Sequence, residues 1–406
     1  MEVNMMKRVD IIYGQSLKGI EGINYVNSAF VEGNKYFKKN GIILSKIYSP
    51  YEIFDCINQN RLTLIGSDMH LSSYERKRKV RMFLRKIFSS DYLPGASLKF
   101  YLNYIITSQK SVHNYLRAKS ESDFIIFQSF LSAYFYFKYS KNKNKKTILI
   151  LHCSKDPFEQ MAPNFKGLFS HRWFKKWIYG RLNFVFYKID KIVYLSKRAV
   201  EYSSASKDKK TYIYNGEEDL KEWIPTDVHE PLNLVCVGSM NWRKGQDLVI
   251  EALSRLSRVK RDKIKFHLVG DGPQMAELKN AVIANNLQNI VAFYGARNDV
   301  ASFLREMDVF IMPSKTEGLP MSIIEVLRQG MYVMSTDTGA IPEMVKEDFG
   351  KIIDRNPDNI AKILEELVDK KIINIELKKQ AREHYLNHFT LHSMIDGYSN
   401  LLNSLG

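Results

Sequence analysis

The sequence has few of the features that mark secreted or membrane-spanning proteins. Its 406 residues include three widely spaced cysteines, so no disulfide framework is expected and a reducing compartment is favoured. The longest run without a charged residue, 280–296, is shorter than the roughly 20 apolar residues that cross a bilayer. The first residues, MEVNMMKRVDIIYG, have the pattern of a strand and not of a signal peptide. We therefore expect a cytoplasmic chain.

Patterns that hold a metal ion are missing as well. No Asp-x-Asp triplet occurs, and the nine histidines and three cysteines form no cluster with the spacing of metal ligands. We therefore expect neither a metal site nor a bound cofactor. Any charge that develops on an anionic substrate would have to be met by Lys, Arg and backbone N–H groups.

Charge is unevenly distributed along the chain. Residues 1–215 carry 37 Lys and Arg against 16 Asp and Glu, whereas residues 216–406 carry 23 against 28. The first part therefore has a net charge of +21 and the second of −5, which together give the +16 of the whole chain. This asymmetry indicates that the first part meets a polyanionic surface, with nucleic acid and anionic membrane as the candidates.

Short apolar runs alternate with helical patterns throughout. In the second part the runs are LNLVCVG, KIKFHLVG, NIVAFYG, VFIMPS, MYVMST and GKIID, and the first part has RVDIIY, IILSKIY, DFIIFQ, KKTILILHC and DKIVYLS. Such runs between helices are typical of parallel strands that are buried on both faces. We predict an α/β fold with two doubly wound, Rossmann-like domains divided near 215, and a single helix over 23–39.

The segment SKTEGLPMSIIEVLRQG follows one of these strands and carries the strongest candidate site. Pro320 suits the first turn of a helix, where Gly318 and Leu319 would offer backbone N–H groups to an anion. Glu317 before the helix could hold sugar hydroxyls, and Glu325 within it could accept from a ribose diol. Spacing alone equally allows a second interpretation, in which Glu317 complements the helix dipole and Glu325 is a solvated residue.

Several segments of the second part resemble one known family. Glu317-x7-Glu325 within EGLPMSIIEV, followed by GMYVMSTDTGAIPEMV, resembles the donor-site signature of retaining GT-B glycosyltransferases of family 4. VGSMNWRKGQDLVIEAL and HLVGDGPQMAELK are similar to earlier segments of that family. The resemblance implies two Rossmann-like domains that face each other across a cleft. The implied divisions are 1–215, 216–384, and a helix at 385–406 that returns to the first domain.

The resemblance also implies roles in a donor site. Glu317 would contact hydroxyls of the transferred sugar, Glu325 the ribose, and Lys244 the diphosphate of a nucleotide sugar, with UDP favoured. The family usually has an arginine where Ser239 stands, and Arg243 is the candidate for the missing cation. Lys244 and Arg243 would stabilise the charge on the leaving diphosphate in place of a metal.

Further positions of the family fall on His152, Gly22, Gly272 and Arg297. His152, at the end of the strand TILILH, would face the donor sugar, and Gly22 would lie in a turn near the donor phosphate. Gly272 and Arg297 would line the base side of the nucleotide pocket. Without the resemblance, His152 is better interpreted as the cap of a buried strand. For Gly22, an ordinary strand-to-helix turn that requires glycine is an equally good interpretation. Retention in this family is attributed to front-face attack, so no protein nucleophile is assigned.

Two basic, aromatic segments of the first part, 74–88 and 169–188, have the pattern of amphipathic helices. Basic helices with aromatic residues such as Trp173 and Trp177 are typical of anionic membrane surfaces, where lipid-linked acceptors of many family members are found. A solvated helix face is the alternative interpretation. No nucleic-acid-binding signature accompanies the charge, so nucleic acid is disfavoured.

Together these observations predict a metal-independent, retaining glycosyltransferase that is peripheral at the inner face of the cell membrane. It would move a sugar from a nucleotide-diphosphate donor to a lipid-linked glycan in capsule or exopolysaccharide biosynthesis. Three alternatives stay open: a nucleotide-sugar epimerase of GT-B architecture, a transferase for a protein or other soluble acceptor, and a non-enzymatic membrane- or nucleic-acid-binding module. An epimerase would not need a basic, aromatic face, and a binding module would leave the donor-site pattern unexplained.

Overall fold

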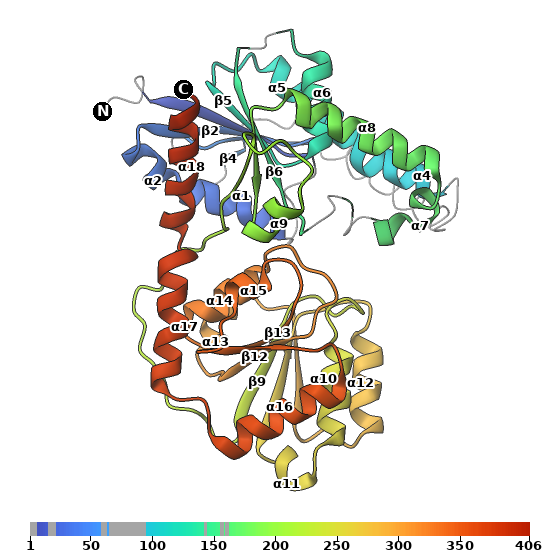
Figure 1. Ribbon diagram of the computed structural model, residues 1–406, viewed down its shortest axis with the longest axis vertical. Coiled ribbons are helices and arrows are strands. Elements are labelled where there is room, and N and C mark those ends of the chain that lie inside the picture. The colour runs from blue at the N-terminus through green and yellow to red at the C-terminus, as the bar shows by residue number, and fades with distance from the viewer. Residues whose placement is uncertain are drawn as a thin grey trace. The chain divides into compact units, whose positions relative to one another are not determined.

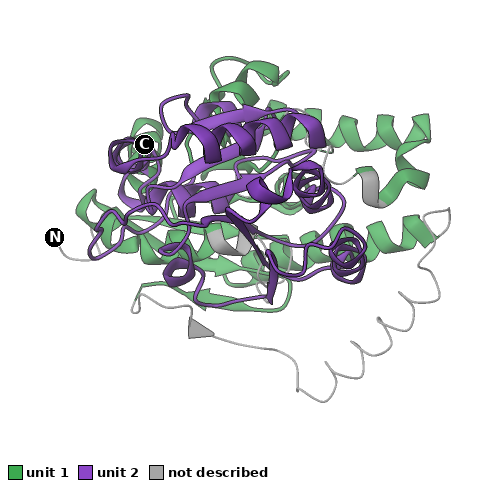
Figure 2. Ribbon diagram, turned by 90° about the horizontal axis from the view of Figure 1, so that it is seen from below, with its two compact units in different colours: residues 1–214, 394–406 green, residues 215–393 purple. Residues whose placement is uncertain are grey.

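The computed structural model describes residues 6–14, 22–57, 63–64, 95–141, 144–154, 158 and 162–406. The chain forms two compact units, which Figure 2 shows in different colours: unit 1 comprises residues 1–214 and 394–406, and unit 2 comprises residues 215–393. The division lies next to the boundary expected near 215, whereas the segment that rejoins unit 1 begins at 394 and not at 385. The basic segment 74–88, expected to be helical, lies outside the described residues.

Unit 1 is built on a sheet, and Figure 1 labels its strands β2, β4, β5 and β6. The described strands of this sheet have the order β4-β3-β2-β1-β5-β6-β7-β8. Strand β3 pairs antiparallel with both β2 and β4 at one edge, and the remaining pairs are parallel. The central apolar runs are buried on both faces, as their composition predicts. The strands are β1 (Lys7–Ile12), β2 (Ile42–Tyr48), β3 (Ile53–Asp55), β4 (Thr63–Leu64), β5 (Phe124–Phe127), β6 (Lys146–Leu151), β7 (Lys191–Tyr194) and β8 (Lys210–Tyr212).

Helices of unit 1 pack against this sheet and against one another. Phe100 of α4 meets Phe174 of α8 edge-on, with ring centroids 5.2 Å apart, within a core rich in aromatic side chains. Within the described ranges, no helix is long and apolar enough to cross a membrane. The helices are α1 (Gly22–Glu32), α2 (Asn34–Lys39), α4 (Gly95–Phe100), α5 (Ile106–Arg117), α6 (Phe130–Tyr139), α7 (Lys166–Phe169), α8 (Arg172–Lys188), α9 (Lys197–Tyr202) and α18 (Leu391–Leu405).

The helix predicted over 23–39 is divided at Gly33 into α1 and α2. A Cβ atom on Gly33 would lie 2.5 Å from Cγ1 of Ile395 in α18, so only glycine permits this approach. Phe30 of α1 packs edge-on against Tyr398 of α18, with ring centroids 4.9 Å apart. The C-terminal helix is therefore an integral part of the core of unit 1.

Unit 2 contains a parallel sheet with the order β11-β10-β9-β12-β13-β14, the arrangement of a Rossmann-type sheet. The order reverses between β9 and β12, and open sheets of this kind bind ligands at the carboxyl ends of the strands beside such a reversal. The strands are β9 (Leu232–Val237), β10 (Ile264–Val269), β11 (Val291–Gly295), β12 (Val309–Met312), β13 (Tyr332–Thr336) and β14 (Gly350–Ile353). The helices are α10 (Gln246–Arg255), α11 (Arg258–Arg261), α12 (Met275–Ala284), α13 (Val300–Leu304), α14 (Met321–Arg328), α15 (Ile341–Met344), α16 (Pro357–Lys370) and α17 (Ile375–His388).

Two glycines with unequal surroundings provide a matched test of the packing around α18. Gly33→Ala should lower the free energy of unfolding by roughly 1–3 kcal/mol, because the new methyl group would overlap Ile395 and the carbonyl oxygen of Ala29. Gly180 in α8 has no atom within 4 Å of its Cβ position, so Gly180→Ala should raise it by roughly 0.5–1 kcal/mol. Urea unfolding followed by circular dichroism measures both. Two variants with equal stability would contradict the close contact with α18.

Candidate active site

Two loops of unit 2 meet where the strand order reverses. The loop 238–245 follows β9 and leads into α10, and the loop 313–320 follows β12 and leads into α14. The N–H group of Lys315 donates a hydrogen bond to the carbonyl oxygen of Arg243 at 2.7 Å. The basic segment RKG and the acidic segment EGLP are thereby brought together, although 73 residues separate Lys244 from Glu317.

Lys244 and Glu317 form a direct ion pair between these loops. Nζ of Lys244 is 2.8 Å from Oε1 of Glu317, and the two side chains are only 12% and 8% exposed. Arg243 lies 3.8 Å from the other carboxylate oxygen and donates a hydrogen bond to the carbonyl oxygen of Thr316 at 2.9 Å. Two cations thus surround one carboxylate, and the cluster keeps one net positive charge with which to attract an anion.

Close backbone contacts fix the two loops. Gly245 has a φ of +76°, and a Cβ atom there would lie 2.5 Å from the carbonyl oxygen of Pro313. Gly339 has a φ of +57°, and a Cβ atom there would lie 2.3 Å from the carbonyl oxygens of both Glu317 and Gly318. Glycine fits such left-handed conformations at close range. The segment around Gly339 is part of the family resemblance, but its local sequence pattern gives no sign of this supporting role.

Arg355 is a second residue that the sequence analysis missed. Its Nε donates a hydrogen bond to the carbonyl oxygen of Pro313 at 3.1 Å, and its Nη2 donates one to the carbonyl oxygen of Trp242 at 2.8 Å. Arg355 therefore ties both loops to the segment that follows β14. The available signal was its position just after the apolar run GKIID, at the same edge of the sheet.

The N-terminus of α14 presents backbone N–H groups next to Glu317. Pro320 is the N-cap, just before the first turn in which it was expected, and the helix begins at Met321. Within the part of the chain that the structure describes, the N–H groups of Gly318 and Leu319 donate no hydrogen bond. The carbonyl oxygen of Gly318 accepts one from Ala340 at 2.8 Å, which holds the loop. Such N–H groups at the positive end of a helix are suited to an anion.

Glu325 is the fifth residue of α14 and is partly buried. Burial, together with repulsion from Glu217, raises the pKa of Glu325 to about 7, while Arg328 opposes this shift. Glu325 is thus partly buried in the structure and not a fully exposed residue of the helix face. A ribose diol would donate hydrogen bonds to the ionised carboxylate and so would favour it over the protonated form.

The loops after β9 and β10 pack closely at the same edge. A Cβ atom on Gly272 would lie 2.3 Å from the carbonyl oxygen of Met240, so the two loops touch through their backbones. The hydroxyl of Ser239 accepts a hydrogen bond from Nδ2 of Asn241 at 2.5 Å. At the position where the family usually has an arginine, Ser239 thus stabilises its own loop and contributes no charge.

Arg297 lies just after β11, on the predicted base side of the pocket. It forms an ion pair with Asp299 at 2.5 Å, and its guanidinium lies 4.9 Å from the ring centroid of Phe303. The hydrogen bond from Arg297 lowers the pKa of Asp299. The side chain is therefore held near the end of the strand, with its charge balanced by the neighbouring carboxylate.

The predicted residues His152 and Gly22 lie in unit 1. His152 follows β6 directly, and Gly22 is the first residue of α1. Burial lowers the pKa of His152 to about 4, which leaves a neutral imidazole at pH 7. Its Nε2 has no hydrogen-bond partner among the described residues. A neutral imidazole can bind a sugar hydroxyl but cannot serve as a cation for the diphosphate.

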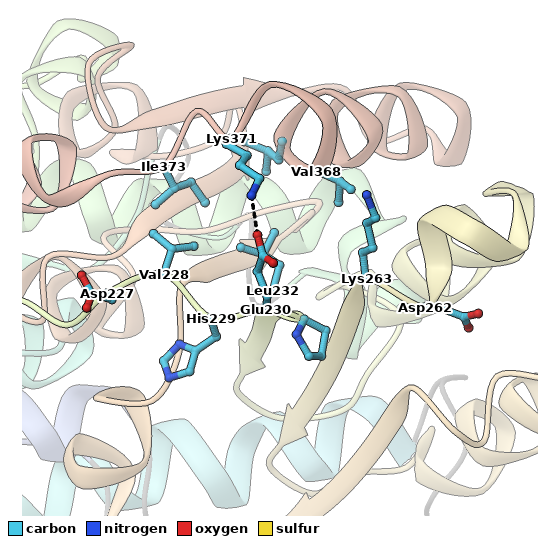
Figure 3. A pocket seen from close by; sticks show the side chains of 12 residues that line it. Asp227, Val228, His229, Glu230, Leu232, Asp262, Lys263, Val368, Lys371 and Ile373 are labelled. Carbon is cyan, nitrogen blue, oxygen red and sulfur yellow. Dashed lines mark hydrogen bonds and ion pairs between the residues drawn. The ribbon is translucent and has the colours of Figure 1, made fainter.

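A cavity of about 520 Å³ lies at the opposite edge of the unit 2 sheet (Figure 3). Its lining includes Leu232 at the start of β9 and Lys263 just before β10, and it includes no predicted site residue. In Figure 3, Lys371 points toward Glu230, and their ion pair spans 2.6 Å. Neither here nor elsewhere among the described residues do three or more His, Cys, Asp or Glu side chains gather closely enough to hold a metal ion.

Solved structures share this fold along almost the whole chain. The Anabaena protein HepE in complex with UDP matches 98% of this chain and 100% of its own, with a TM-score of 0.64 and 14% identity. The lipopolysaccharide outer core galactosyltransferase WaaB in its apo form matches 98% of this chain and 99% of its own, with a TM-score of 0.62 and 14% identity. The predicted fold class is confirmed: the protein has the GT-B fold of glycosyltransferases, with two Rossmann-like units.

Sequence comparison finds relatives of the donor-site segment. Residues 219–384 match the family profile described as glycosyl transferases group 1. The Escherichia coli O-antigen biosynthesis glycosyltransferase WclY is 28% identical over 226 residues, which cover 53% of this chain and 62% of WclY. An E. coli UDP-Gal:α-D-GlcNAc-diphosphoundecaprenol α-1,3-galactosyltransferase is 32% identical over 139 residues, which cover 34% and 36% of the two chains. The matched part thus spans less than two thirds of these relatives.

Removal of the Lys244 charge should destabilise unit 2. Lys244→Met leaves the Glu317 carboxylate buried, so unfolding should become easier by roughly 2–3 kcal/mol, somewhat less than for a fully buried pair because Arg243 remains. Lys315→Met, at an exposed position of the same loop, is the control and should change stability little. Urea unfolding at pH 7 is the measurement. Adding Glu317→Gln to Lys244→Met should restore part of the loss, and a double variant with no recovery would contradict the ion pair.

Proposed function

We propose that this protein is a glycosyltransferase that moves a sugar from a UDP-sugar to a glycan acceptor in surface polysaccharide biosynthesis. The observation that carries the proposal is the cluster of Lys244, Arg243 and Glu317 beside the N–H groups that precede α14. The family match over 219–384 supports the activity, and the UDP bound to HepE supports the nucleotide. The names of the two E. coli relatives, one with a diphosphoundecaprenol-linked acceptor, support a lipid-linked glycan.

The proposed reaction is a transfer with retention of configuration. The bond between the anomeric carbon and the β-phosphate oxygen of UDP breaks while the acceptor hydroxyl oxygen bonds to that carbon. The departing phosphate oxygen takes the proton of the acceptor hydroxyl, so no protein nucleophile takes part. Negative charge grows on the diphosphate during this step, and positive groups placed beforehand lower the barrier.

The cluster supplies such groups without a metal ion. Lys244, Arg243 and the N–H groups of Gly318 and Leu319 would face the diphosphate, and one preorganised donor of this kind contributes about 2.7–4 kcal/mol in other enzymes. Because Lys244 fixes one carboxylate oxygen of Glu317, the remaining lone pairs are oriented toward hydroxyls of the transferred sugar. The ion pair thus links recognition of the sugar to stabilisation of the leaving group.

A panel of UDP-sugars tests this function. Hydrolysis of each sugar is measured as the release of UDP, with EDTA present in excess. Glu317→Gln should lower kcat/KM by about 10²–10³-fold, because it removes an acceptor for the sugar and releases Lys244. Glu376→Gln, an exposed carboxylate on α17, is the matched control and should retain full activity. Turnover that stops with chelator and returns with magnesium would contradict the metal-independent mechanism. If no UDP-sugar is turned over, or Glu317→Gln matches the control, the proposed activity is wrong.

The proposal includes contact with an anionic membrane surface through α8. This helix contains five Lys and Arg residues and no Asp or Glu. Trp173 is 58% exposed, and Phe184 and Tyr187 are exposed on the same face. Trp177, the other expected anchor, packs inward instead, with the guanidinium of Arg181 lying 3.7 Å from its ring centroid. Aromatic side chains flanked only by cations are suited to the headgroup region of an anionic leaflet.

Vesicle binding tests this surface. Wild-type protein should sediment with vesicles of phosphatidylglycerol and phosphatidylcholine, and salt should weaken binding as the screening length falls from ~10 Å at 0.1 M to ~3 Å at 1 M. Replacing Trp173, Phe184 and Tyr187 together with Ser should reduce the salt-resistant part several-fold, because apolar insertion is not screened. Ile283→Ser, at an equally exposed position of unit 2, should have no effect. Equal binding by both variants would remove α8 as the contact.

A further inference from the structure

Glu217 lies in the segment through which the chain enters unit 2, and its backbone is fixed there. Its N–H group donates a hydrogen bond to the carbonyl oxygen of Phe389 at 3.0 Å, and its carbonyl oxygen accepts one from Leu391 at 2.7 Å. A Cβ atom on the preceding Gly216 would lie 2.1 Å from the carbonyl oxygen of Thr390. The entering segment and the segment that leads out of unit 2 are therefore bound side by side.

The side chain of Glu217 reaches the last turn of α14. Its Oε1 is 2.7 Å from Nη1 of Arg328, and both side chains are largely buried. Arg328 also donates a hydrogen bond to the carbonyl oxygen of Glu218 at 2.8 Å, and its own carbonyl oxygen accepts one from Arg382 of α17 at 3.0 Å. The end of α14 is thereby held by the entering segment on one side and by α17 on the other.

Glu325 lies three residues before Arg328, so the two side chains are neighbours on α14. The charged and titratable groups of the surrounding elements are Glu217, Glu218 and Asp219 of the entering segment, Arg328 of α14, and Arg382 and Tyr385 of α17. Among them, Glu217 acts against the ionised form of Glu325 and Arg328 acts in its favour. Removing the charge of Glu217 should therefore lower the pKa of Glu325, and removing the charge of Arg328 should raise it.

We propose that Glu217 is a positioning residue for the donor nucleotide, which holds Arg328 and places a negative charge beside Glu325, so that ribose binding weakens as the pH falls below neutral. The inference rests on the proposed function, because it requires that Glu325 accepts hydrogen bonds from the ribose of UDP. The segment that connects the two units would then control nucleotide affinity without touching the nucleotide.

The size of the effect follows from the ionisation of Glu325. With its pKa at about 7, roughly one tenth of the free protein carries the ionised form at pH 6 and roughly nine tenths at pH 8. Since the diol binds the ionised carboxylate, this group should strengthen UDP binding by up to about tenfold over that range. Burial is the larger cause of the raised pKa and remains in Glu217→Gln, so the variant lowers the pKa only in part. It should bind UDP more tightly than wild type at pH 6, by less than about tenfold, and within about twofold at pH 8.

Calorimetric titration of the full chain with UDP at pH 6, 7 and 8 tests the inference. The ratio of the Kd values of wild type and variant at each pH cancels the titration of the UDP phosphate itself. Glu218→Gln removes the adjacent carboxylate and should keep the wild-type profile. Arg328→Gln should shift the profile the opposite way and weaken binding most at pH 6 and 7, whereas simple loss of structure would weaken both Arg328→Gln and Glu217→Gln.

The outcomes separate this inference from the proposed function. If wild type does not bind UDP, or Glu325→Gln binds it equally well at pH 8, the proposed donor site is wrong. If binding depends on Glu325 but Glu217→Gln keeps the wild-type pH profile, the donor site stands and this inference is overturned. Should Glu217→Gln fail to fold, the pH dependence of UDP binding by Arg328→Gln decides the question. If the midpoint of that dependence equals the wild-type midpoint, the inference is overturned.

Discussion

The reversal of strand order between β9 and β12 is the constraint on which the site in unit 2 depends. The chain continues from β9 toward β10 on one side and from β12 toward β13 on the other. The Lys244–Glu317 ion pair joins the loops that follow β9 and β12. A buried pair of this kind is stable only while both partners are present, because either charge alone is costly to bury. The position of the Glu317 carboxylate, the shape of both loops and the surplus positive charge therefore depend on one contact.

The loops at the carboxyl ends of the unit 2 strands are closely packed through their backbones. Five of the seven glycines with positive φ among the described residues lie at the end of a strand of unit 2 or in the loop after one: Gly238, Gly245, Gly270, Gly295 and Gly339. A Cβ atom on Gly245, Gly270 or Gly339 would lie within 2.5 Å of a carbonyl oxygen, so these loops touch through their backbones and the peptide dipoles near α14 are held in place. Such dipoles need little rearrangement when charge develops, which is the property that favours catalysis by preorganisation.

The elements of the fold follow from local sequence patterns, whereas the contacts between elements do not. The apolar run IILSKIY coincides with β2, because alternation of buried strands and helices is a local property of the chain. The break at Gly33 depends on Ile395, which lies hundreds of residues away, and no local pattern reports such a neighbour. Periodicity shows that a helix face is buried but not which residue covers it, and for the same reason it could not separate Trp173 from Trp177.

In the candidate site, too, the residues can be found from the sequence but the contacts between them cannot. Glu317 and Lys244 were assigned to one site through a family resemblance, since their spacing alone left a solvated interpretation open. Neither the ion pair between them nor the effect of Glu217 on Glu325 could be read from the sequence, because both depend on distances between separate loops. Arg355 followed a predicted strand like many other polar residues, and only its two carbonyl contacts distinguish it.

Unit 1 is discontinuous in sequence, whereas unit 2 is one continuous stretch. During synthesis, residues 394–406 emerge from the ribosome only after all of unit 2 has been made. Until then the surface of α1 that receives α18, including Phe30 and the gap at Gly33, remains uncovered. The part of the protein that is synthesised first is therefore the part that completes its fold last, and unit 2 can fold before it. A fragment that stops at the boundary after residue 214 would likewise lack a component of its own core.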